Sequence, residues 1–438
     1  MDESGWTAGQ LTNAIRALGM QQGLDLAYDR TAVGHWMAGS KPPAPVPRLV
    51  AAAFERKLGR VVTPEQTGLT LWDPDLSRPG TPSVPGPVDF AAEVHRVGMA
   101  EVQGSPGGAG TARAYSLRGL PGPWPASTII APPDENSAER ESVLRVASMV
   151  EIFGALPERF GGAHARTSVA AYLTWDVAPL LRSVRHTGHR VEMLRLTAQL
   201  THVLASMSRD SGRHGAAQHH LHVALQLAHL AGDRALGAIL LRSMGTHALQ
   251  LGQVVASVRL SDAAVEVAGA DASPAVFSYV LAGRAEAHAA GRQRTAALAD
   301  LARAEAYHER SVDLVSAGQF HRYSQGSLAY QRAKVLAALC DHDTAIRALE
   351  ESILTRPADL RWSVALSRAE MGMLLLAEHR LDDACEQWRA FLADYHTLRS
   401  ERARFALADI RRALGPFRRS APALRLLRHI EEITRDGT

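Results

Sequence analysis

The chain contains few aromatic residues, which make up 5% of its 438 residues, although 46% of the residues are hydrophobic. Sheets favour aromatic and β-branched side chains, whereas alanine and leucine suit closely packed helices. The scarcity of aromatics therefore argues against a sheet protein and predicts an all-α fold. A chain of this length exceeds what one hydrophobic core usually supports, so we expect several domains or a repeat array.

Cysteine and long apolar runs are also scarce. Cys340 and Cys385 are the two cysteines and have no CxxC spacing, which indicates buried or inert thiols in a reducing compartment. Apolar runs such as MGMLLLA at 371–377 are much shorter than the roughly 20 residues that cross a bilayer. No charged-then-apolar leader begins the sequence. We expect a cytoplasmic protein without a membrane segment.

Motifs that carry catalysis are absent from the sequence. It has no HExxH, GxSxG or GxxxxGK pattern, and the run GSPGGAG at 104–110 is not followed by the Lys-Ser/Thr pair of a phosphate-binding loop. His219 and His222 stand three apart on a predicted helix, but no Cys or carboxylate is placed to complete a metal site with them. We therefore expect no enzyme activity, no cofactor and no bound metal.

Positive charge is concentrated in two segments, although the whole chain carries only +3. Residues 30–60 hold six basic residues against the single acid Glu55, and residues 399–428 hold nine arginines against two acids. Such clusters bind phosphates or form solvated helix faces. The first cluster is a candidate phosphate-binding surface, and the second is interpreted mainly as a polar cap on the last helices.

Composition divides the chain into three regions. Residues 1–72 form a small helical domain, residues 73–137 form a Pro/Gly-rich linker with one short ordered piece near 88–102, and residues 138–438 are helical throughout. Within the third region, GGAHAR at 161–166 is interpreted as a turn between two helices. The alternative is an anion site at a helix N-terminus, formed with His164 and Arg166.

The third region repeats itself. A small residue is followed by a larger one four positions later and by a third apolar or small residue three positions after that, at spacings of 39, 41, 48 and 39 residues. The small residues are Ala217, Ala256, Ala297, Ala345 and Ala384. A small residue lets a second helix approach the first, and the larger residue fills the space between them. The pattern predicts an array of helix pairs and resembles the signature of tetratricopeptide repeats.

The first region contains a short helix with one apolar face. Thr7 is placed to cap a first helix that runs to about Met20, and Asp29 is placed to cap the next. Val33 and Trp36 share a face of this second helix, so Thr31 and His35 are expected to face outward. Leu49 to Leu58 reads as a further helix.

The segment DRTAVGHWMAGSKPPAPVPRLVAAAFERKLG resembles the recognition helix and following helix of phage-repressor-type (XRE-like) regulators. The segments at 160–182 and 210–237 look like an actinobacterial regulator family that joins such a module to tetratricopeptide repeats and includes negative regulators of sporulation and antibiotic production. The resemblance implies an all-α fold with a helix-turn-helix-like domain, a linker and an α-solenoid. It also implies transcriptional regulation, often repression.

On this reading, Thr31 and His35 meet base edges, while Arg30, Lys41 and Arg48 contact phosphates. The repeat region dimerises or senses a peptide, a small molecule or a protein partner in its groove. One feature departs from the family pattern, because only eight residues separate Met20 from Asp29, too few for a full scaffold helix. The alternative is therefore a scaffold that binds protein partners without touching DNA.

Overall fold

The computed structural model describes most of the chain, and every regular element in the described part is helical. The described residues are 5–21, 28–37, 40, 42, 46–58, 62, 67, 69, 89–103, 114–115, 120–125, 138–270, 272–311, 323–357 and 359–436. The predicted all-α fold is confirmed. None of the helices in these ranges is both long and apolar enough to cross a membrane.

The N-terminal region folds as three helices, α1 (Ala8–Gln21), α2 (Arg30–Met37) and α3 (Val46–Leu58), around a small apolar core. Thr7 caps α1 as predicted: its hydroxyl accepts from the Gln10 amide at 3.3 Å, and the Gln10 side chain accepts from the Thr7 amide at 2.9 Å. This reciprocal pair satisfies donors that the first turn leaves unpaired.

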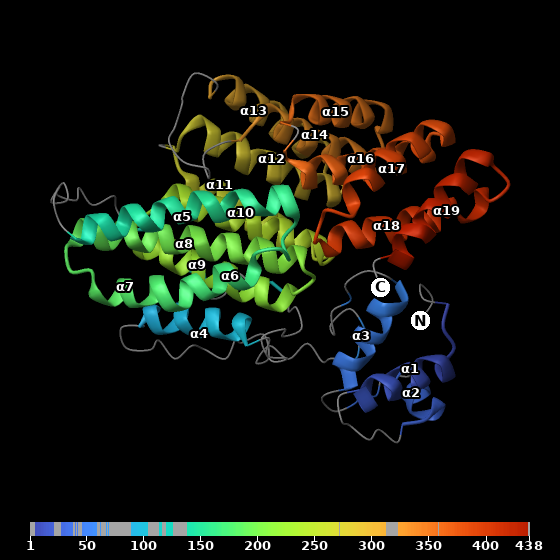
Figure 1. Ribbon diagram of the computed structural model, residues 1–438, viewed down its shortest axis with the longest axis horizontal. Helices are drawn as coiled ribbons and strands as arrows, with labels where there is room; N and C mark the ends of the chain where they lie inside the picture. The colour runs from blue at the N-terminus through green and yellow to red at the C-terminus, as the bar shows by residue number, and fades with distance from the viewer. Residues whose placement is uncertain are drawn as a thin grey trace.

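The rest of the chain stacks consecutive antiparallel helix pairs (Figure 1). The pairs are α8 (Thr187–Asp210) with α9 (His214–Leu230), α10 (Arg234–Gln250) with α11 (Val254–Ala268), α12 (Pro274–Ala290) with α13 (Arg294–Glu309), α14 (Gln325–Ala338) with α15 (His342–Thr355), and α16 (Arg361–Ala377) with α17 (Leu381–Tyr395). Each pair also contacts the next pair, which is the architecture of a repeat solenoid. The predicted helix-pair array is confirmed.

The structure corrects the predicted register in the second unit. Ala256 is half-buried, whereas the neighbouring Ser257 and Ala264 are fully buried. Helices α9, α11 and α13 begin at residues 214, 254 and 294, so the first spacings are 40 and 40 rather than 39 and 41. Alanine-rich helices offer several small residues in succession, and sequence alone did not separate the two alignments.

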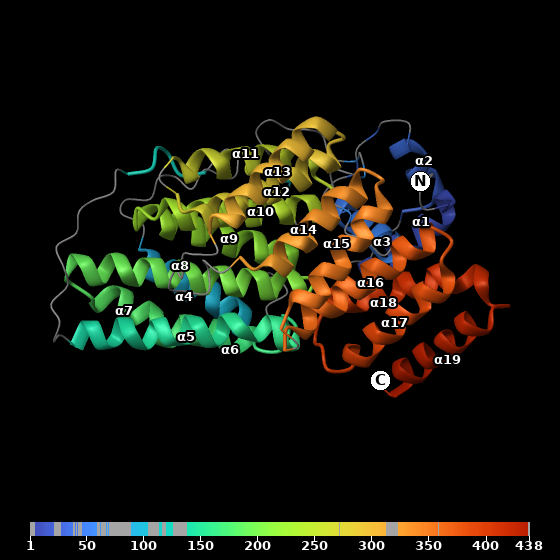
Figure 2. The same cartoon turned by 90° about the horizontal axis from the view of Figure 1, so that it is seen from above.

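Additional helices flank the pairs. Before the first pair come α5 (Ala138–Phe160), α6 (Arg166–Tyr172), the π-helical turn η3 (Leu173–Val177) and α7 (Ala178–Ser183). After the last pair come α18 (Glu401–Leu414), the short 3₁₀ turn η5 (Gly415–Phe417) and α19 (Ala421–Asp436). Helix α5 packs against α8 and also against α16, so the beginning and the end of the array touch (Figures 1 and 2).

Backbone hydrogen bonds complete this closure of the array. Ala163 donates to the Arg399 carbonyl at 3.0 Å, and Arg399 donates to the Phe160 carbonyl at 2.7 Å. The contact requires two glycines: Gly161 has a positive φ of 82°, and a Cβ on Gly162 would come within 2.7 Å of the Asp210 Cβ. The Gly-Gly pair therefore serves the turn and the closure, as the turn interpretation of GGAHAR expected.

Part of the segment expected as a linker packs onto the repeat body. Helix α4 (Phe90–Val102) is the predicted ordered piece, and it lies along α6, η3 and α7 with Ala91, Val94 and Val97 buried (Figure 1). Gly98 allows this close approach, because a Cβ there would be 2.7 Å from the Ala170 carbonyl oxygen. The domain boundaries drawn from composition remain a prediction.

Candidate functional site

Helix α2 presents two different faces. Val33 and Trp36 are only 2% and 8% exposed, and the ring of Trp36 meets Tyr28 edge-on at 5.3 Å between centroids. Thr31 and His35 are exposed on the opposite side. The i, i+3 and i+4 spacing of a helix places the two sets on separate faces, because consecutive residues turn by about 100°.

Gly34 lies on the same outward face as Thr31 and His35. It is exposed, and no atom lies within 4 Å of the place where its Cβ would be. A glycine costs roughly 1 kcal/mol relative to alanine in a helix, and no neighbour in the fold requires it here. Sequence reasoning did not select this residue, although a glycine in the middle of a helix is a position where another group can approach the backbone closely.

The beginning of α2 is capped by a carboxylate. Asp29 accepts hydrogen bonds from the amides of Thr31 at 3.0 Å and Ala32 at 2.9 Å, and the Ala32 bond is the main cause of a lowered pKa for Asp29. The predicted cap is therefore present. It also occupies the first amides of α2 with a fixed negative charge, so a phosphate would not bind at that end of the helix.

The sequence predicted five DNA-contacting residues in this module, and the structure describes the side chains of only some of them. Arg30, Thr31 and His35 are exposed on α2. Arg48 belongs to α3, but its side chain is not described, and Lys41 lies outside the described residues. The structure thus places three of the five residues at exposed positions of one helix.

A second charged cluster joins α4 to the repeat body. Glu101 is 3% exposed and forms ion pairs with Arg166 and with Arg213, the latter at 3.3 Å between Nε and the carboxylate. The Ser208 hydroxyl donates to the same carboxylate at 3.3 Å, and His220 Nε2 lies 3.8 Å from it. A buried carboxylate needs such partners, because an unpaired charge in the interior is very costly.

Glu101 was not among the predicted residues. The available signal was an acid on the apolar stripe of α4, seven residues after Val94 and on the same face. Its partners lie 65 or more positions away along the chain, so only the fold brings them together.

Histidines of α9 and α10 contact α4 and Tyr115, which precede the repeats in the chain. His219 lies 3.1 Å from Glu93 of α4, and this hydrogen bond is the main cause that lowers the pKa of Glu93 to about 2. The Tyr115 hydroxyl lies 2.7 Å from His247 Nδ1, and His214 contacts the other nitrogen of the same ring at 3.0 Å. These histidines therefore hold α4 and Tyr115 against α9 and α10.

The first helices of the pairs carry polar side chains that bond to one another. Arg242 donates to the Tyr279 hydroxyl at 3.0 Å and to Gln331 at 2.7 Å, and its guanidinium stacks 4.1 Å from the Tyr279 ring. Tyr330 donates to Glu370 at 2.8 Å. These contacts join four successive first helices, α10, α12, α14 and α16, and so couple each pair to the next.

One comparison with known proteins bears on the N-terminal module. Residues 1–70 match a family model described as the SP15 N-terminal domain, and these residues include α1, α2 and α3. No curated protein matches the chain. The chain therefore combines a domain similar to the SP15 N-terminal domain with an all-helical body of stacked helix pairs.

Proposed function

We propose that the protein is a DNA-binding transcriptional regulator whose N-terminal module docks on DNA through the outward face of α2. The observation that carries the proposal is the arrangement of Thr31, Gly34 and His35 opposite the buried Val33 and Trp36. A helix anchored on one side presents its other side to the major groove, where side chains meet base edges. Gly34 would permit the backbone to come close to the DNA.

The positive charge of the N-terminal module supports docking on DNA through this face of α2. Arg30 is exposed beside Thr31, and residues 30–60 carry six basic residues against one acid. In this proposal Arg30, Lys41 and Arg48 contact phosphates and set the docking angle, while Thr31 and His35 select the sequence. The resemblance to XRE-like regulators with tetratricopeptide regions favours the same function, with repression as its common form in that family.

A single short helix makes few base contacts, so we expect a homodimer that places two modules on neighbouring half-sites. Half-sites one helical turn apart, about 34 Å, would match such a dimer. The repeat body would control docking by dimerising or by binding a peptide, a small molecule or a protein partner. The linked first helices of the array provide a continuous connection over which binding could be communicated.

Selection of genomic fragments by the full-length protein, followed by gel shift at several salt concentrations, tests the proposal. Specific DNA should be enriched, and log K should fall with log salt by about 0.9 for each phosphate contacted. Changing both Thr31 and His35 to Ala should relax the sequence preference, whereas Arg48→Ala should weaken all DNA about equally. Arg411, exposed on α18, provides a matched Arg→Ala control outside the module.

Two results would contradict the proposal. If no fragment is enriched while the protein still captures partners, the scaffold function replaces it. If DNA binds but the Thr31 and His35 changes leave the preference intact, a different surface reads the DNA.

A further inference from the structure

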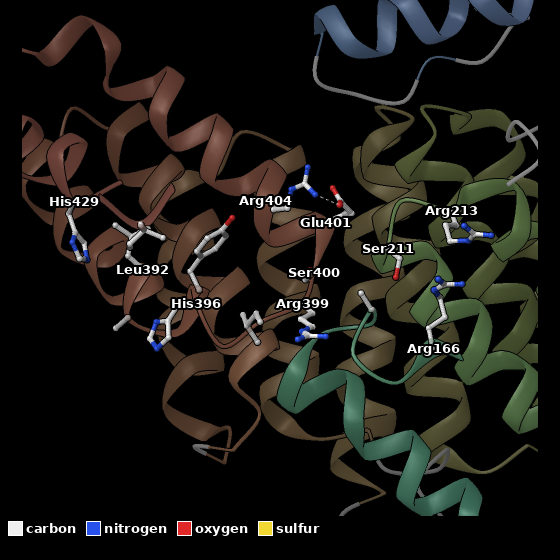
Figure 3. Close-up of a pocket in the computed structure, with 15 residues that line it drawn as sticks. Arg166, Ser211, Arg213, Leu392, His396, Arg399, Ser400, Glu401, Arg404 and His429 are labelled. Atoms are coloured by element: carbon white, nitrogen blue, oxygen red, sulfur yellow. Dashed lines mark hydrogen bonds and ion pairs between the residues drawn. The ribbon is translucent and has the colours of Figure 1, made fainter. Parts of the chain in front are cut away.

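A large cavity lies where the beginning and the end of the repeat array meet (Figure 3). Its volume is about 960 Å³, within the range of sites that hold small organic molecules. Its walls come from the turn before α6 and the start of α6, the turn between α8 and α9, the segment 396–400 between α17 and α18, and the helices α17, α18 and α19. The closure of the array therefore builds this cavity, and no single repeat contains it.

The cavity is cationic at one end. Arg166, Arg213 and Arg399 gather there with Ser211, while Arg404 and Glu401 pair with each other along one wall (Figure 3). With Glu401 and the neighbouring Glu101 both counted, the four arginines leave a net charge of +2. Arg399 is exposed and has no carboxylate partner among the described residues, so its guanidinium is available to a ligand.

The other end is less polar. Leu392 lies there with His396 and His429 (Figure 3), and Leu398 and Ile433 are further aliphatic residues of the lining. A cavity with guanidiniums at one end and aliphatic side chains at the other suits a molecule with one anionic head group and an apolar body. A bare inorganic anion would leave the aliphatic end unfilled.

The cationic end is shared with α4. Arg166 and Arg213 line the cavity and also hold the buried Glu101, yet Arg166 Nε and Arg213 Nη2 are buried without a hydrogen-bond partner in the described part of the chain. Burial, and to a lesser degree the nearby positive charge of Arg213, lower the pKa of Arg166. Glu101 thus supplies only part of the negative charge that these two guanidiniums can accept.

We propose that this cavity binds a small organic anion with an apolar body, and that the anion shares Arg166 and Arg213 with Glu101 and thereby loosens α4. A second negative charge on the same guanidiniums weakens their attraction for Glu101, because like charges repel across a poorly solvated site. Helix α4 is the first helix of the described chain after the N-terminal module, so its release would lengthen the segment that joins that module to the repeat body. The inference deepens the sensing role proposed above and names its ligand class.

Binding can be measured on the full-length protein without DNA, so its failure is distinct from a failure of DNA binding. Calorimetry with octanoate and octyl phosphate, with octan-1-ol as the uncharged control, should show one site for the anions and none for the alcohol. The two anions separate a carboxylate from a phosphate head group. Arg399→Gln should weaken the better anion at least tenfold, whereas Arg411→Gln on the outside of α18 should not change it.

Glu101→Gln tests the coupling in the opposite direction. Removing the competing charge should strengthen anion binding about fivefold or more, which a purely structural role for Glu101 would not produce. In the unmodified protein, the anion should speed hydrogen exchange of α4 amides, and in Arg399→Gln it should not. This second measurement keeps the test valid if Glu101→Gln fails to fold.

Equal binding of the alcohol and the anions, or equal affinities for Arg399→Gln and Arg411→Gln, would overturn the anion site. Anion binding with unchanged exchange in α4 would overturn the coupling.

Discussion

The indole of Trp388 lies directly on the backbone of Gly372, and its Nε1 donates to the Ala369 carbonyl at 3.2 Å. A Cβ on Gly372 would come within 2.2 Å of that same nitrogen. Trp388 occupies the position where the repeat pattern places the larger residue, four positions after Ala384. The contact explains how α16 and α17 pack together although α17 carries a tryptophan on the face that meets α16.

Gly372→Ala should destabilise the protein by about 1–3 kcal/mol, because a fully buried indole has no free space into which it can move. Urea unfolding of the full chain measures the effect. Gly34→Ala is the matched control, since that glycine has open space and alanine favours helices. A Gly372 variant as stable as the control would contradict the packing described for this pair.

Gly34→Ala also tests the DNA-reading surface. The variant should be as stable as the parent or slightly more stable, yet it should bind specific DNA several-fold less tightly, because the added methyl group separates α2 from the base edges. Gel shift with the selected fragment and thermal unfolding of the same sample give both results. Unchanged affinity would mean that this face of α2 does not approach DNA closely.

Asp210→Ala should destabilise the closure of the array. The Asp210 carboxylate accepts from the Gly162 amide at 2.7 Å, the Ser400 hydroxyl at 2.7 Å and the Trp362 indole at 3.1 Å. The substitution removes this shared acceptor and leaves the Gly162 amide and the Ser400 hydroxyl without it. A loss of about 3 kcal/mol is expected in urea unfolding.

The control for this loss is Asp409→Asn. Asp409 makes only an exposed ion pair with Arg412, so its replacement should cost less than about 1 kcal/mol. Similar losses for the two variants would show that the closure contributes little to stability.

Stability should fall when the pH is lowered from 7 to 5. Burial lowers the pKa of His202 to about 3, of His214 to about 4 and of His220 to about 3. In the unfolded chain these rings bind protons below about pH 6.5, whereas in the folded protein they stay neutral, so protons favour unfolding. Each such histidine contributes up to about 1.4 kcal/mol per pH unit below pH 6.

Urea unfolding at a series of pH values measures how the free energy of unfolding changes with pH. His220→Gln should reduce the pH dependence of the free energy of unfolding by the contribution of one histidine. A free energy of unfolding that stays flat between pH 7 and 5 would show that these rings are not kept neutral by burial.

Short-range patterns in the sequence were sufficient for the faces of α2 and for the existence of the helix pairs. Val33 and Trp36 lie three positions apart, and the cap at Asp29 is local, so the helical period alone placed them correctly. The repeat signal likewise recurs within about 40 residues. It did not fix the register of α11, because neighbouring alanines and serines fit the pattern equally well.

Contacts between distant segments could not be predicted in this way. Asp210 and Ser400 are 190 positions apart, and Glu101 meets Arg166 across 65 positions. Neither pair has a local signature, since an acid within a helix is usually solvated. The cavity at the closure depends on these distant contacts. For that reason the sequence favoured a turn at Arg166, with an anion site as the alternative, and a polar cap for the arginines after residue 398.

Open solenoids lengthen and shorten readily during evolution, because a duplicated or deleted unit disturbs only its neighbours. This array is different, since Arg399 must reach Phe160 and Ala163 at the opposite end. Inserting or removing one helix pair would move Arg399 away from Phe160 and Ala163, and these hydrogen bonds would be lost. The closure therefore constrains the number of helix pairs, and proteins that share it should differ in their loops and not in how many pairs they contain.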